Sequence, residues 1–224
     1  MQASASPSAW RGALLPLVAL IVAGGLLVAY AFSAMAWLDR PFLGAFPQRD
    51  LTIGAAHSLA RGHWPARDAG LRADDRLLAL DDTDLSTLPA ADRLKAFYDR
   101  LDTYNTSDTL TVRFLRRSGE GPGSADCFAV DGGELRCALA LGLSTLPSGD
   151  LAAYFAPGWL MGVLIWAVGV VLLARRPADA LVRSAALVAA TGAVTMAGQF
   201  EVLTGGRLDW TWSLGLALAG AALG

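Results

Sequence analysis

The sequence predicts a small α+β domain inserted between transmembrane α-helices. Of its 224 residues, 54% are hydrophobic and only 17% are charged, whereas a soluble domain carries about a quarter charged residues. Residues 38–150 hold 13 of the 18 Lys and Arg and 17 of the 20 Asp and Glu. We therefore expect a cytoplasmic N-terminus and anchor helix in residues 1–37, the α+β domain in 38–150, and a helical bundle in 151–224.

Four uncharged or weakly charged runs are candidates for membrane helices. The first is Ala13–Ala36, and the others lie at about 151–174, 180–203 and 210–224. A crossing needs about 20 apolar residues, so the last run is too short as it stands. This indicates that the chain is the N-terminal part of a longer protein.

The first run also contains a sequence typical of signal-peptidase cleavage, Ala34-Met35-Ala36. The apolar run from Ala13 to Phe32 is longer than the roughly 7–15 residues of a signal-peptide core. That length favours an uncleaved anchor, and a cleaved signal peptide remains the alternative.

Arginine placement predicts the orientation of the chain in the membrane. Arg175, Arg176 and Arg183 surround the turn between the second and third apolar runs. The positive-inside rule places this turn in the cytoplasm. Residues 38–150 are then extracytoplasmic, and the N-terminus with Arg11 is cytoplasmic.

Within residues 38–150 the periodicity is that of a mixed domain. Alternation with period two predicts strands at Asp50–Ala55 and from Thr109. A short buried strand is expected at Arg76–Leu80, and a helical turn at Pro65–Ala69 that ends at Gly70. A longer helix is expected at 89–101, and its apolar face consists of Leu94, Phe97, Tyr98 and Leu101.

The segment Trp64–Leu80 (WPARDAGLRADDRLLAL) resembles the P-A-x-x-A-G-L-x-x-G-D-x-I-L-x-V-N-G signature of bacterial PDZ domains. With the elements that follow, the resemblance covers about residues 42–117. It implies a small antiparallel β-barrel or sandwich with two helices. Asp74 and Asp82 depart from the pattern, because they stand where the family has glycine. Such positions usually require a positive φ, so the departures bear on local turn geometry.

The resemblance also implies a peptide-binding groove, in which an extended peptide adds to a sheet edge beside a helix. Its carboxylate would be held by backbone N–H groups of a hydrophobic-Gly-hydrophobic loop. The residues expected to form this site are Leu43, Gly44, Ala45, Phe46, Leu51, Ile53, Leu94 and Phe97. The alternative is that residues 42–46 form only a juxtamembrane turn and that the groove is closed or unused.

Two cysteines are expected to form a disulfide across a hairpin. Asp131-Gly132-Gly133 is a turn signal, and a three-residue loop pairs Val130 with Glu134. Counting outward then places Cys127 opposite Cys137, near the reach of a disulfide. The predicted extracytoplasmic location favours an oxidised pair.

No catalytic, metal or nucleic-acid motif is apparent. The two histidines, His57 and His63, lack the HExxH context of an intramembrane metalloprotease. The acidic pairs Asp74-Asp75 and Asp81-Asp82 are interpreted as solvated turn residues. No cofactor or metal is expected, and no basic run alternates with aromatic residues as nucleic-acid binding would require.

The third apolar run contains the polar residues Thr191, Thr195, Gln199 and Glu201. They are expected to face other helices or the headgroups, and Glu201 is interpreted as an interfacial residue. Gly192 and Gly198 fit close helix packing.

This order of segments resembles the input half of bacterial membrane signalling proteins, in which such a module precedes a histidine kinase or phosphatase domain. The resemblance implies a multi-pass protein of the bacterial inner membrane, with the lipid bilayer and an envelope peptide or protein as partners. Any enzymatic output would lie downstream of Gly224, and a homodimer is left open. The alternative function is an envelope scaffold that docks a partner through its PDZ-like domain.

Overall fold

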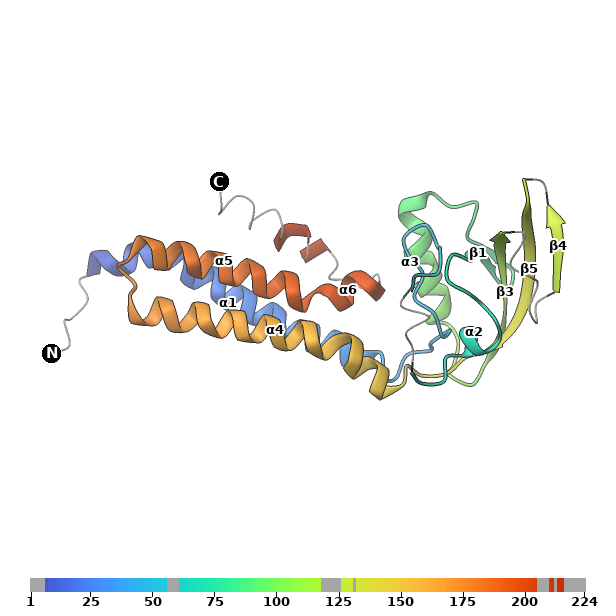
Figure 1. The fold of residues 1–224 in the computed structure, drawn as a ribbon, viewed down its shortest axis with the longest axis horizontal. Helices are drawn as coiled ribbons and strands as arrows, with labels where there is room; N and C mark the ends of the chain where they lie inside the picture. Colours follow the sequence, from blue (N-terminus) through green and yellow to red (C-terminus); the bar gives the residue numbers. More distant parts are fainter. Residues whose placement is uncertain are drawn as a thin grey trace. The chain divides into compact units, whose positions relative to one another are not determined.

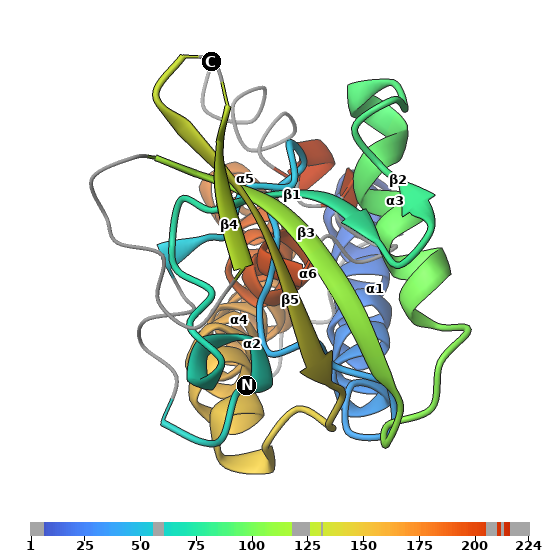
Figure 2. The same cartoon turned by 90° about the vertical axis from the view of Figure 1, so that its right-hand side faces the viewer.

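We analysed a computed structural model that describes residues 7–55, 61–117, 126–130, 132–204, 210–211 and 213–215. The chain divides into two compact units. The helical unit comprises Met1–Ala34, Ala152–Val202 and Gly206–Gly224, and the α+β unit comprises Met35–Leu151 and Leu203–Gly205. Figure 1 shows the helices and strands of both units, which we describe separately, and β2 is labelled in Figure 2.

The helical unit accounts for the apolar runs of the sequence. Its helices are α1 (Pro7–Ala36), α4 (Ser148–Arg175), α5 (Ala180–Ala197) and α6 (Gln199–Thr204). Three segments are long and apolar enough to cross a membrane: Gly12–Ala36, Ser148–Arg175 and Ala180–Thr204. Of the expected fourth run, residues 210–211 and 213–215 are helical, and the rest lies outside the described residues.

Small residues bring α4 and α5 close together. A Cβ atom on Gly162 would lie 2.7 Å from the Ala193 carbonyl oxygen, and one on Gly169 would lie 2.7 Å from the Ala189 Cβ. Only glycine allows this approach, as in other membrane helix pairs. The sequence had suggested Gly192 and Gly198 for close packing. The atom nearest to a Cβ on Gly192 belongs to Ile165, at an ordinary 3.7 Å, whereas a Cβ on Gly198 would lie 3.0 Å from the Tyr30 hydroxyl of α1.

Two indoles join α4 to α1. Trp159 Nε1 donates to the Leu27 carbonyl over 2.9 Å, and Trp166 Nε1 donates to the Leu20 carbonyl over 2.8 Å. Both donors and both acceptors are seven residues apart, so the contacts repeat every two helical turns. They satisfy indole N–H groups that would otherwise be costly in an apolar medium.

The α+β unit is built on one five-stranded antiparallel sheet with the order β2-β1-β3-β5-β4. Its strands are β1 (Arg76–Leu80), β2 (Thr83–Asp84), β3 (Thr109–Arg117), β4 (Asp126–Val130) and β5 (Glu134–Gly142). Helix α3 (Ala90–Leu101) lies on one face of the sheet (Figures 1 and 2). The apolar side of α3 and the inward residues of β3 form one core, which includes Leu94, Phe97, Leu110, Val112 and Phe114.

Most of the expected elements of this unit are confirmed. Helix α2 (Pro65–Asp68) is followed by Gly70 with a φ of 97°, the left-handed conformation that favours glycine after a helix. Asp74 has a positive φ of 69°, as its glycine-like place in the pattern suggested. In the next turn the positive φ, 47°, belongs to Asp81 rather than to Asp82.

The expected strand at Asp50–Ala55 is wrong as a continuous strand. Only isolated bridges form there, between Pro47 and Ile53 and between Thr52 and Arg76, and Leu51 has a φ of 68°. The Asp50 carboxylate accepts hydrogen bonds from the N–H and the hydroxyl of Thr52, at 3.0 and 2.9 Å. Such local side-chain bonds stabilise a turn in place of an extended strand.

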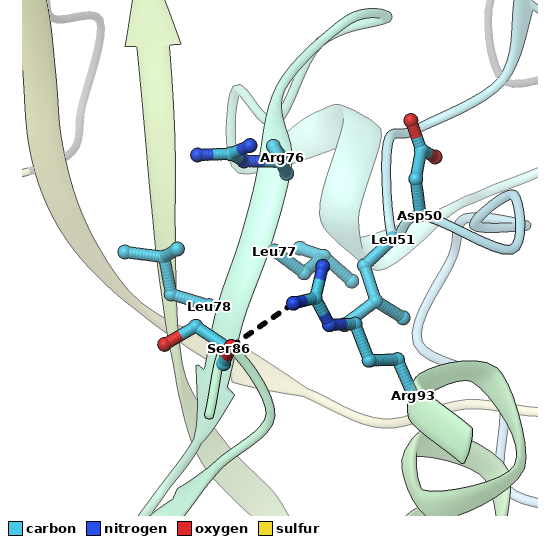
Figure 3. A pocket seen from close by; sticks show the side chains of 7 residues that line it. All are labelled: Asp50, Leu51, Arg76, Leu77, Leu78, Ser86 and Arg93. Carbon is cyan, nitrogen blue, oxygen red and sulfur yellow. Dashed lines mark hydrogen bonds between the residues drawn. The ribbon is translucent and has the colours of Figure 1, made fainter. Parts of the chain in front are cut away.

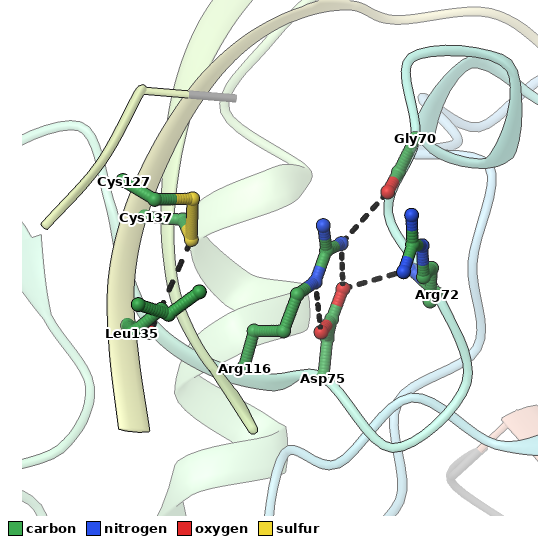
Figure 4. The surroundings of a disulfide bond; sticks show 7 residues. All are labelled: Gly70, Arg72, Asp75, Arg116, Cys127, Leu135 and Cys137. Atoms are coloured by element: carbon green, nitrogen blue, oxygen red, sulfur yellow. Dashed lines mark hydrogen bonds and ion pairs between the residues drawn. A yellow bond between two sulfur atoms is a disulfide. The ribbon is translucent and has the colours of Figure 1, made fainter. Parts of the chain in front are cut away.

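The hairpin and its disulfide are confirmed. Strands β4 and β5 pair Val130 with Glu134 and Cys127 with Cys137, which is the expected register. The two cysteines form a disulfide, and the Cα atoms are 4.1 Å apart (Figure 4). The disulfide therefore links the two strands of the hairpin through residues that are ten positions apart in the chain.

One acidic residue that we expected in a solvated turn is instead buried in an ion pair. Asp75 accepts hydrogen bonds from Arg116 Nε at 2.9 Å and from Arg116 Nη2 at 2.6 Å (Figure 4). The Arg72 N–H donates to the same carboxylate over 2.8 Å, and Arg116 Nη2 also donates to the Gly70 carbonyl over 2.7 Å. This ion pair thereby attaches strand β3 to the turn that connects α2 with β1.

Candidate functional site

The residues expected to form a peptide groove are almost entirely buried. Six of them belong to the core of the α+β unit: Leu43, Ala45, Leu51, Ile53, Leu94 and Phe97. Phe46 is also buried, among the rings of Trp37, Phe42 and Trp64. The structure thus brings these residues together, but as packing groups inside the domain rather than as the lining of an open groove.

Both backbone edges of the segment 51–54 are occupied. On one side Ile53 N–H donates to the Asp75 carbonyl and Leu77 N–H donates to the Leu51 carbonyl, at 2.8 and 3.0 Å. On the other side the chain turns back on itself, and we call residues 46–54 the closing hairpin. In it, Gln48 N–H donates to the Thr52 carbonyl over 2.8 Å, and Gly54 N–H donates to the Phe46 carbonyl over 3.3 Å. A peptide could add to this segment only by displacing residues 46–48.

Gly44 fits tightly against helix α2. Its φ is 90°, and a Cβ atom would lie 2.6 Å from the backbone nitrogens of Pro65 and Ala66. The Ala66 N–H also donates to the Leu43 carbonyl over 3.0 Å. Glycine is therefore required here for the conformation of the loop and for its close approach to α2.

A small pocket opens beside the closing hairpin, between β1 and α3. Its volume is about 90 Å³, and its lining residues are Asp50, Leu51, Arg76, Leu77, Leu78, Ser86 and Arg93 (Figure 3). Arg93 Nε donates to the Leu88 carbonyl over 2.9 Å, and its Nη2 donates to the Ser86 carbonyl over 3.1 Å. These bonds hold a guanidinium group at the side of the pocket. The volume suits a few atoms, such as a carboxylate or a short side chain.

The charge of this pocket is mixed. The Thr52 N–H, and to a smaller extent the charge of Arg76, keep the pKa of Asp50 below its ordinary value, although partial burial opposes them. Asp50 is therefore ionised at neutral pH, and the residues that line the pocket include this carboxylate and two arginines, Arg76 and Arg93. Leu51 adds backbone strain, since a left-handed conformation costs a leucine about 1–2 kcal/mol. Such strain is often found at functional sites.

Side-chain contacts also attach the first and last segments of the α+β unit, those that continue into α4 and follow α1, to the rest of that unit. Asp150, in the first turn of α4, accepts hydrogen bonds from the N–H groups of Arg61 and Gly62 at 3.0 and 2.9 Å and from Trp64 Nε1 at 2.7 Å. After α1, Arg40 forms an ion pair with Asp102 at 2.5 Å. The segments that lead from this unit to the apolar helices are thus bonded to its own loops.

The described residues contain no group of three or more His, Cys, Asp or Glu that could hold a metal ion. The His63 ring contacts the Asp68 carboxylate, and His57 lies outside the described residues. Glu201, interpreted above as interfacial, is buried with 1% of its surface exposed. It is within electrostatic reach of Tyr30, whose hydroxyl hydrogen-bonds to Thr211.

Arg93 and Arg116 were not among the expected site residues. The alternation of β3 could have predicted that Arg116 is buried, because it lies an even number of residues from Leu110, Val112 and Phe114 and therefore points to the same, buried side of the strand. A buried arginine needs an acidic partner. No comparable signal existed for Arg93, since its guanidinium is positioned by the backbone carbonyls of Ser86 and Leu88.

Comparisons with protein-family models, with curated proteins and with solved structures find no match for this chain.

Proposed function

We propose that this chain is a membrane-anchored input module whose PDZ-like domain binds the C-terminus of a partner and passes the event to the apolar helices. The proposal draws on the order of elements α2, β1, α3 and β3, which follows the family pattern. The output domain of a histidine kinase or phosphatase would lie beyond residue 224. The observation that carries the proposal is the closing hairpin, because residues 46–48 occupy the backbone edge of segment 51–54 to which an added peptide would pair.

In this proposal residues 46–48 act as an internal competitor. A peptide that displaced them would take over the hydrogen bond of Gly54 N–H, while Gln48 would lose its bond to Thr52. The pocket beside Leu51 and Arg93 would receive a side chain or carboxylate of the peptide. A ligand can shift such an equilibrium only by its difference in affinity for the two states.

Displacement of this strand has a direct route to α1. Phe46 packs edge-on against Trp37, with ring centroids 5.4 Å apart, and Trp37 directly follows the last residue of α1. Trp37 also packs against Tyr98 of α3 at 5.7 Å. Moving Phe46 would therefore loosen the aromatic contacts of Trp37, the residue that directly follows α1 in the chain.

A proline substitution tests the competition. Gln48→Pro removes the N–H that donates to Thr52, and one such bond contributes about 0.5–1.5 kcal/mol. If the hairpin competes with the ligand, the affinity for a C-terminal peptide rises by about 2- to 12-fold, because the open fraction rises. Gln48→Ala, which keeps the N–H, is the matched control and should bind as the wild type does.

Peptides with free C-termini would be selected on the full chain in phosphatidylcholine nanodiscs and titrated by fluorescence anisotropy. Equal or weaker binding by Gln48→Pro would contradict the competition. A failure of every C-terminal library to yield a binder would contradict the PDZ-like function itself.

A further inference from the structure

The side of the sheet opposite α3 presents a basic surface that also carries apolar side chains. In the register of the sheet, Arg76 of β1 lies beside Leu115 of β3, Leu115 beside Arg136 of β5, and Arg136 beside Phe128 of β4. Directly paired residues point to the same side, and the core residues Phe114 and Cys137 alternate with them on the other side. Basic and apolar side chains therefore alternate across four neighbouring strands.

Two more arginines extend this surface along β3. Arg113 and Arg117 lie two residues on either side of Leu115 and are exposed, as are Arg76, Arg136 and Phe128. We call the set Arg76, Arg113, Leu115, Arg117, Phe128 and Arg136 the arginine face. Figure 2 looks onto it, and none of the described helices or strands of the α+β unit covers it.

The charge of the arginine face is opposite to that of its domain. Residues 38–150 carry 17 acidic and 13 basic residues, yet this face has four arginines against three carboxylates on the same side, Asp84, Asp126 and Glu134. Among the described residues, no hydrogen bond or ion pair engages the guanidinium groups of Arg117 and Arg136. Those groups keep all their donors for another molecule.

An exposed aromatic residue on this basic face indicates the kind of partner. Phe128 is 59% exposed on the edge strand β4, and the half-buried Leu115 lies two strands away, on the other side of Arg136. Protein interfaces are enriched in aromatic residues and arginine, and guanidinium groups bind carboxylates through paired hydrogen bonds. Charge complementarity then selects an acidic partner, and the two apolar side chains select one that also carries aliphatic or aromatic side chains.

We propose that the arginine face binds an acidic segment of a protein partner, which places carboxylates on Arg117 and Arg136 and apolar side chains against Leu115 and against Phe128. This surface is on the far side of the sheet from α3, so the inference does not depend on peptide binding at the closing hairpin.

The test uses the full chain in phosphatidylcholine nanodiscs and two labelled 12-residue peptides. One peptide alternates Glu with Leu and Phe, and the other has Gln in place of each Glu. The acidic peptide should bind, with an affinity that falls as salt is added, and the Gln peptide should bind about tenfold more weakly or not at all. Equal binding of both peptides, or no binding of either, would overturn the proposal.

Charge reversal locates the site. The double variant Arg117→Glu/Arg136→Glu should lose about tenfold or more in affinity for the acidic peptide, and Phe128→Ala several-fold. Lys95→Glu, an equal charge change per residue on exposed α3, should stay within about twofold. If the double variant loses its structure by limited proteolysis, Arg136→Glu alone serves in its place.

A parallel experiment tests whether the arginine face binds anionic lipid headgroups instead of an acidic peptide. Nanodisc-embedded protein would be mixed with vesicles of pure phosphatidylcholine or with 30% phosphatidylglycerol. Arginine-dependent capture by the anionic vesicles without peptide binding would assign the face to a membrane surface and overturn the proposal. A loss of peptide binding equal in Lys95→Glu and in the double variant would do so as well.

Discussion

Arg116→Met is expected to be among the most destabilising single changes in the α+β unit. The side chains of Arg116 and Asp75 are 0% and 2% exposed. The change removes both hydrogen bonds from the guanidinium to Asp75 and the bond to Gly70, and leaves the carboxylate with the Arg72 N–H. Breaking a buried pair by removing one partner costs about 3–5 kcal/mol. Since whole domains are stable by about 5–15 kcal/mol, the variant should be marginal.

The assay is pulse proteolysis in urea on the full chain in mild detergent, which reports cleavage of the unfolded α+β unit. Arg117→Met is the matched control, because Arg117 is the next residue, is exposed and points to the other side of β3. Its effect should stay within about 0.5 kcal/mol. The double variant Asp75→Leu/Arg116→Met should be more stable than Arg116→Met, because it leaves no unpaired charge. A cost below about 1 kcal/mol for Arg116→Met would refute the reasoning.

Three further predictions concern other parts of the chain. Gly44→Val should destabilise the domain by about 2 kcal/mol or more through strain and collision with α2. The control is Gly132→Val, because the φ of Gly132 is also positive but the space around it is open, so urea denaturation should show a smaller loss of stability. Equal losses in the two variants would exclude the collision. The Tyr104 hydroxyl and the Thr111 N–H lower the pKa of Asp81 from 3.8, so its stabilisation is present above that value and is lost as the pH falls through the folded-state pKa; Asp81→Asn should make stability less dependent on pH below about 4, and an unchanged acid profile would contradict this. A single cysteine at Ala178, made in a variant lacking the native pair, should resist an impermeant thiol reagent in intact cells, and labelling there would reverse the predicted topology.

The β4–β5 hairpin could be predicted from sequence because its determinants are local. A three-residue turn signal sets the register, and the register alone decides that Cys127 meets Cys137. Helix α3 was predictable for the same reason, since its apolar positions recur at helical spacing. The apolar spans required only length and composition.

The segment around Leu51 could not be predicted in this way. Its alternation is that of a strand, but the Asp50 side chain bonds to Thr52 and Leu51 takes a left-handed conformation. The gain from burying Leu51 and Ile53 in the core outweighs that local strain, and burial of this kind depends on residues distant in the chain. Asp75 was misjudged similarly, because its partner Arg116 lies 41 residues away.

The close packing of Gly44 against α2 changes how a substitution of this residue is interpreted. From sequence alone, substitution of Gly44 would be a test of carboxylate binding that leaves the domain folded. In the structure Gly44 supports the packing of α2, so a bulky residue there tests stability instead. Variants of Gln48, whose side chain is exposed, separate ligand binding from folding.

Hydrogen exchange at two backbone amides tests the central claim most directly. The full chain in nanodiscs would be measured with and without a saturating C-terminal peptide. If the peptide replaces residues 46–48, the Gln48 amide loses its bond to Thr52 and exchanges faster, while the Gly54 amide stays protected by the peptide. If the Gln48 amide remains as protected with peptide as without it, the closing hairpin is not the element that the ligand displaces.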